Sequence, residues 1–124
     1  MNTSKIAESL ARSDGGQWHF IAGIVLALGC SLVISGIAPA ERPSNFYQLI
    51  GAGGCFFFGS FWFTCTGWVL ARLDQLARSE GERSVEGPVL VKQRLVAAAL
   101  GRISLNISCG AICCALAFAV LFVR

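Results

Sequence analysis

The chain has 124 residues, of which 55% are hydrophobic and 14% are charged, and its formal net charge is +3. Soluble domains carry about 25% charged residues, and a domain this small has too much surface to hide so many apolar side chains from water. The composition argues against a disordered chain and against a soluble enzyme domain. It predicts an all-α integral membrane protein. We expect a single membrane domain over residues 1–124, with three transmembrane helices and a short cytoplasmic N-terminal segment.

Three uncharged stretches predict the membrane spans, near residues 17–40, 45–72 and 102–123. Each is as long as the ~20 residues that a helix needs to cross ~30 Å of hydrocarbon. Helices are expected because lipid offers no water to the backbone polar groups. Residues 73–101 are predicted to form a partly helical cytoplasmic loop. There Pro88 is suited to begin a helix, and the pair Asp74 and Arg78 supports a helical extension of the second span.

The Lys and Arg residues near the spans are unevenly divided between the two sides of the predicted membrane. One side has seven, in the N-terminal segment and around the 73–101 loop: Lys5, Arg12, Arg72, Arg78, Arg83, Lys92 and Arg94. The other side has two, Arg42 and Arg124. Because Lys and Arg favour the inner side, the N-terminus is expected in the cytoplasm, or in the matrix of a mitochondrion. The predicted location is a bacterial or mitochondrial inner membrane.

Small residues recur at four-residue spacing in all three predicted spans. The rows are Gly23, Ala27, Ser31 and Ser35 in the first span; Gly51, Cys55 and Gly59 in the second; and Ala111, Ala115 and Ala119 in the third. This spacing places each row on one helix face, where two backbones can approach closely. Three such rows exceed what one three-helix bundle needs. We therefore expect part of them to contact other membrane subunits or bound lipid.

Arg102 stands at the start of the third span and has two interpretations. If the third helix begins near Ile103, Arg102 is an interfacial anchor that extends to the headgroups. If the apolar pattern begins at Leu95, Arg102 lies about two turns deep and pairs with a lipid phosphate or a partner carboxylate. Among the polar residues within the spans, Asn106 is the one from which we expect an interhelical hydrogen bond.

The sequence carries no recognisable pattern for catalysis or cofactor binding. All six cysteines fall within the spans, without the loop-borne spacing of a zinc or redox site, so we interpret them as packing residues. His19 is the only histidine, which excludes a haem held by two histidines of this chain. The spans contain no Asp or Glu, which argues against a proton-coupled carrier. We therefore predict no enzyme activity, no catalytic, cofactor-binding or metal-binding residues, no nucleic-acid partner and no soluble small-molecule substrate.

The expected function is that of a non-catalytic accessory subunit in a larger membrane complex. Its role would be structural, stabilising or in assembly, within a respiratory, secretory or biosynthetic complex. The alternative is a self-assembling, holin-like pore or channel, which would need a polar stripe facing its lumen. Ser104 and Ser108 share one helix face, but Asn106 points elsewhere. The proteins that co-purify with the chain distinguish the two readings, since a pore would form a ring of this chain alone.

Overall fold

The computed structural model describes residues 5, 8–10, 15–83, 85 and 87–122. Most of the predicted cytoplasmic N-terminal segment, and Val123 and Arg124 at the C-terminus, lie outside the described residues. The elements in chain order are α2 (Gly15–Ile37), α3 (Phe46–Gly81), α4 (Pro88–Ala98) and α5 (Leu100–Phe122). The part of the chain that the structure describes contains no strand, so the all-α class is confirmed. Three helices, α2, α3 and α5, are long and apolar enough to cross a bilayer.

Proline residues account for two of the helix boundaries. α2 ends at Ile37, before the predicted limit at residue 40, because Pro39 disfavours a helical backbone at the preceding Ala38. At the other boundary, α4 begins at Pro88, where a missing N–H costs no helical hydrogen bond. α3 continues beyond the predicted span to Gly81, and α5 begins at Leu100 directly after α4.

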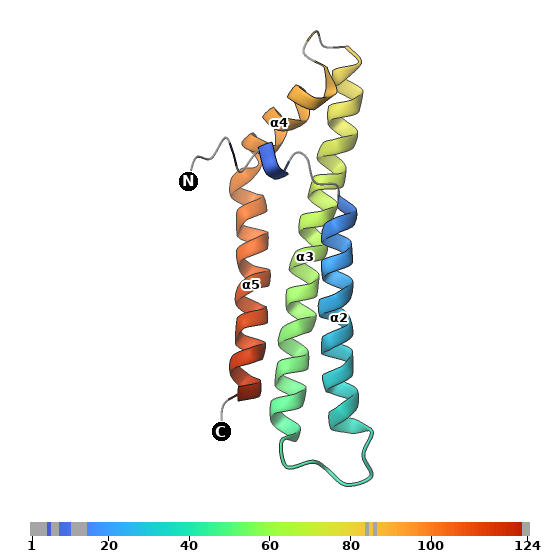
Figure 1. Cartoon of the computed structure of the whole chain (residues 1–124), viewed down its shortest axis with the longest axis vertical. Coiled ribbons are helices and arrows are strands. Elements are labelled where there is room, and N and C mark those ends of the chain that lie inside the picture. The colour runs from blue at the N-terminus through green and yellow to red at the C-terminus, as the bar shows by residue number, and fades with distance from the viewer. Residues whose placement is uncertain (1–4, 6–7, 11–14, 84, 86, 123–124) are drawn as a thin grey trace.

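α3 lies between α2 and α5 and contacts both, whereas α2 and α5 make few contacts with each other (Figure 1). The main core sits beside α3, where Phe56 and Phe63 pack against Ala22, Val25 and Ala117. A second core lies where α3 meets α4 and α5, and it is formed by Leu70, Val96 and Ile103. α3 is therefore the helix on which the rest of the described chain is assembled.

Glycines allow α2 to approach α3 closely. A Cβ atom added to Gly53 would lie 2.6 Å from Val33 Cγ2 and 3.0 Å from the carbonyl oxygen of Gly29. The same contact includes the Ser60 hydroxyl, which donates a hydrogen bond of 3.0 Å to the carbonyl oxygen of Ala22. The backbones thus approach closely enough for a side chain of one helix to bond the main chain of the other.

The contact between α3 and α5 also depends on glycine. A Cβ atom on Gly59 would lie 3.1 Å from Cys114 Sγ and 3.3 Å from the carbonyl oxygen of Gly110. A Cβ atom on Gly110 would lie 3.0 Å from the ring of Phe63. A Cβ atom at either position would therefore require its neighbours to shift by a few tenths of an ångström, so both glycines allow α5 to lie close to α3.

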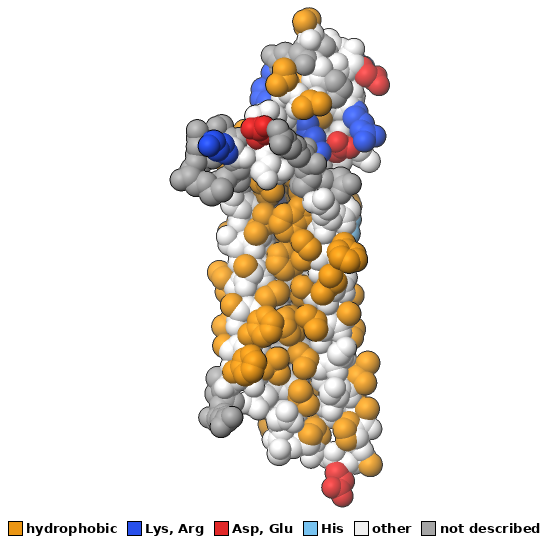
Figure 2. Space-filling view, in the orientation of Figure 1, with side chains coloured by type: hydrophobic (Ala, Val, Ile, Leu, Met, Phe, Trp, Pro, Cys, Tyr) orange, Lys and Arg blue, Asp and Glu red, His pale blue; other side chains and the backbone are white. Residues whose placement is uncertain are grey.

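Charged and apolar side chains are segregated along the molecule. Figure 2 shows apolar side chains over the long helices, with most of the Lys, Arg, Asp and Glu side chains gathered toward the α4 end. The carboxylate of Asp74 in α3 forms two ion pairs, with Arg78 Nη2 at 3.2 Å and with Lys92 Nζ of α4 at 3.3 Å. The ion pair between Asp74 and Lys92 links α4 to the C-terminal part of α3.

Candidate functional site

The small-residue row of α2 faces away from α3. Gly23, Ala27, Ser31 and Ser35 are all exposed, and a Cβ atom on Gly23 would meet nothing within 4 Å. The hydroxyls of Ser31 and Ser35 donate to carbonyl oxygens one turn earlier in their own helix, both at 2.8 Å. The row is therefore a shallow strip whose hydroxyls are already satisfied. The contact with α3 uses the opposite side of α2, formed by Ala22, Val25, Gly29 and Gly36.

The row of α3 is used inside the chain. Gly59 is buried against α5, and Cys55 packs at the edge of the main core. Gly51, at the other end of the row, is more open, but a Cβ atom there would still lie 3.5 Å from Val120 Cγ1 of α5. This row therefore joins α3 to α5.

The row of α5 faces outward like that of α2. Ala111, Ala115 and Ala119 are exposed, whereas Gly110 and Ala117, on the other side of the helix, are buried against α3. The chain thus carries two faces of small residues that its own packing leaves uncovered, which we call the α2 outer face (Gly23, Ala27, Ser31, Ser35) and the α5 outer face (Ala111, Ala115, Ala119).

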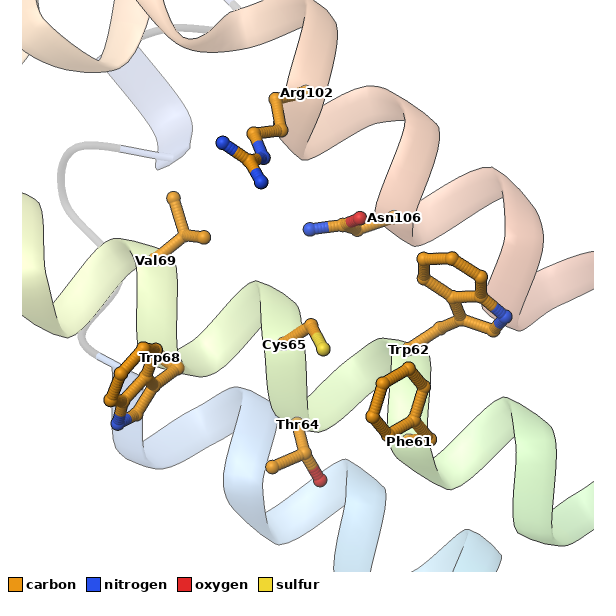
Figure 3. Close-up of a pocket in the computed structure, with 8 residues that line it drawn as sticks. All are labelled: Phe61, Trp62, Thr64, Cys65, Trp68, Val69, Arg102 and Asn106. Atoms are coloured by element: carbon orange, nitrogen blue, oxygen red, sulfur yellow. The ribbon is translucent and has the colours of Figure 1, made fainter.

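A groove of about 580 Å³ lies between α3 and α5, toward the α4 end (Figure 3). Its wall is mainly aromatic and apolar, and its two strongest polar groups, Arg102 and Asn106, lie one turn apart on α5. The lining residues are Phe61, Trp62, Thr64, Cys65, Trp68, Val69, Arg102 and Asn106. We call this the Arg102 groove.

The two strongest polar groups of the Arg102 groove have no hydrogen-bond or ion-pair partner among the residues that the structure describes. Asn106 is only 6% exposed, yet its amide makes no hydrogen bond to any residue that the structure describes. The interhelical bond that the sequence led us to expect from Asn106 is made by Ser60 instead. Arg102 is exposed in the first turn of α5 and forms no ion pair within the described part of the chain. Both side chains point toward the space between α3 and α5 (Figure 3).

The position of the groove's aromatic wall beside Arg102 was not predicted from the sequence. Trp62, Cys65, Trp68 and Val69 recur at three- or four-residue spacing, so they share one face of α3. That face differs from the buried one, which includes Phe63. The spacing was a usable signal, but only the position of α5 brings this face beside Arg102.

Comparisons with protein-family models, with curated proteins and with solved structures found no match for this chain. The six cysteines are free thiols, each partly buried. The described residues contain no group of three His, Cys, Asp or Glu side chains placed to hold a metal ion. The features on which a function can be argued are therefore the two outer faces and the Arg102 groove.

Proposed function

We propose that this chain is an integral membrane protein and a non-catalytic subunit of a larger membrane complex. The lengths of the helices support insertion, because 23 residues of α2 or α5 extend about 34 Å, close to the thickness of a bilayer core. The uneven distribution of Lys and Arg supports an orientation with the N-terminus and α4 on the cytoplasmic or matrix side. A bacterial or mitochondrial inner membrane fits this orientation.

The observation that carries the subunit role is the pair of outer faces. Lipid tails are as apolar as leucine, so helices in a bilayer associate through close packing of small residues. The chain uses other residues for this purpose internally, as at Gly29 against Gly53. Two further faces with the same spacing remain open, one at each outer helix. They are suited to helices of other subunits, with a structural or assembly role.

A pore of identical chains is the second candidate, and one observation favours it. The two outer faces belong to different helices on either side of α3, so the α2 face of one copy could pack on the α5 face of the next. A head-to-tail contact of this kind generates a ring when its rotation closes. Against a pore, the hydroxyls of Ser31 and Ser35 are bonded to their own helix rather than forming an open polar stripe.

Leucine substitutions in the outer faces test the proposal. Ala27→Leu and Ala115→Leu each add bulk where a partner helix should approach, at a cost of about 1–3 kcal/mol. The yield of intact complex after mild-detergent extraction should fall roughly 5- to 150-fold. Membrane insertion should persist, because leucine favours the bilayer. Ile34→Leu is the matched control, since it keeps the volume of an exposed α2 side chain and should leave the yield unchanged.

The outcomes separate the candidates. Unrelated subunits that co-purify with the wild-type chain, and are lost from the Ala27 variant, support the subunit role. A ring containing only this chain supports the pore. Full assembly of both leucine variants would contradict both candidates, because each depends on the outer faces.

A further inference from the structure

The Arg102 groove lies at the level where a bilayer would end. Arg102 and Phe122 are 20 residues apart on α5, which corresponds to about 30 Å of helix and matches the hydrocarbon thickness. Trp68 borders the groove from α3, and tryptophan favours the headgroup region. This placement rests on the proposed membrane insertion but not on the proposed subunit role.

The N–H groups of Arg102 and Asn106 are suited to donate hydrogen bonds to an acceptor in the groove. The Asn106 side chain is 6% exposed, and its amide makes no hydrogen bond to a described residue, so its N–H group is open to an acceptor in the groove. The guanidinium of Arg102 offers five N–H donors and no acceptor. Both side chains point into the same space (Figure 3). The complementary ligand is an anion that accepts several hydrogen bonds, and a phosphodiester fits that description.

The rest of the lining indicates where the phosphodiester comes from. Phe61 and Trp68 are 59% and 75% exposed, so the groove opens on the surface that would face lipid. Among the described residues that line it, there is no carboxylate to pair with the ammonium of a zwitterionic headgroup. We propose that the Arg102 groove binds an anionic glycerophospholipid, with the phosphate on Arg102 and Asn106 and an acyl chain along Phe61 and Trp62.

The tryptophans of the groove provide the assay. The full chain is reconstituted into phosphatidylcholine vesicles that contain a small, increasing fraction of phosphatidylglycerol with brominated acyl chains, which quench nearby tryptophan. Brominated phosphatidylglycerol should reach half-maximal quenching at roughly fivefold lower mole fraction than brominated phosphatidylcholine. Both lipids carry the phosphodiester, but only phosphatidylglycerol has a net negative charge, whose attraction to one arginine is about 1 kcal/mol. Unbrominated phosphatidylglycerol should reverse the quenching.

Two arginine variants test whether the preference for phosphatidylglycerol depends on Arg102. Arg102→Gln should abolish the preference for phosphatidylglycerol, whereas Arg42→Gln should retain it. Arg42 is a matched control because its guanidinium lies 4.0 Å from the centre of the Phe46 ring, at the opposite end of α3 from the groove. Asn106→Ala should raise the mole fraction needed for half-maximal quenching by either lipid several-fold, since it removes one of the two side chains that donate to the phosphate.

Several results would overturn the inference. Equal quenching by the two brominated lipids, or an unchanged preference in Arg102→Gln, would exclude a site for anionic lipid at Arg102. Displacement of the lipid by inorganic phosphate would assign the site to a soluble anion. If Arg102→Gln kept the lipid preference but lowered complex yield, Arg102 would pair with a partner carboxylate. Flotation of the vesicles checks insertion, so failure of insertion is distinguished from failure of lipid binding.

Discussion

Replacement of Gly53 by alanine tests whether close backbone packing holds α2 against α3. The added Cβ atom would lie 2.6 Å from Val33 Cγ2 and 3.0 Å from the carbonyl oxygen of Gly29, whereas carbon atoms in good contact are about 3.5–4.0 Å apart. Val33 cannot easily turn away, because a β-branched side chain in a helix has one strongly preferred rotamer. The carbonyl of Gly29 belongs to the backbone. The two helices must therefore separate by about 1 Å.

The expected loss of stability follows from three contributions. Overpacking of a tight contact costs about 1–3 kcal/mol. Separation of the helices also weakens the hydrogen bond from Ser60 to Ala22, which contributes about 1 kcal/mol. Alanine returns about 0.5–1 kcal/mol, because it is a better helix former than glycine. The net decrease in the free energy of unfolding should be about 1–3 kcal/mol.

The neighbouring Gly54 supplies a matched control. A Cβ atom at Gly54 would meet nothing within 4 Å, so Gly54→Ala should be neutral or slightly stabilising. Both variants can be unfolded by titration with dodecyl sulfate in mild-detergent micelles, with tryptophan fluorescence as the signal. Trp18 is a suitable reporter because its ring stacks on Phe63 of α3, with centroids 6.1 Å apart. Equal stability of the two variants would refute the reasoning from close backbone packing.

Two further substitutions probe polar contacts between helices. Ser60→Ala removes the bond to Ala22 and should lower the free energy of unfolding by about 0.6–1.7 kcal/mol, whereas Thr64→Val, which removes a bond within α3 only, should cost less. Asp74→Asn removes the carboxylate that pairs with the largely buried Lys92, so amide hydrogen exchange in α4 should become faster. Unchanged exchange in α4 would show that this ion pair does not fasten the helix.

The lengths and order of the long helices could be predicted from the sequence because they depend on local properties. An uncharged stretch of sufficient length is visible in the chain itself, as is Pro88 at a helix start. The faces of α2 could not be assigned in the same way. Its apolar residues surround the whole helix, so the row beginning at Gly23 and the face containing Gly29 are equally compatible with packing. The face containing Gly29 is the one that packs on α3, because the missing side chain of Gly53 lets the two backbones approach there.

The Arg102 groove was beyond sequence reasoning for a different reason. Arg102 and Trp68 are 34 positions apart in the chain, and their proximity depends on how α5 lies against α3. That arrangement is set by Gly59 and Gly110, one on each helix. The sequence predicts a lipid phosphate or a partner carboxylate for Arg102 if it lies deep in the span, but it places neither the aromatic residues of α3 nor Asn106 beside it.

The central position of α3 has a consequence for synthesis. α2 contacts α3, the next helix in the chain, whereas α3 reaches α5 only after the intervening α4. Contacts between near neighbours need little loop closure and form quickly. The α2–α3 hairpin can therefore be complete while α5 is still within the ribosome. The face of α3 that packs on α5 stays uncovered until α5 emerges, so this face, rather than α2, is where a nascent chain of this composition is open to aggregation.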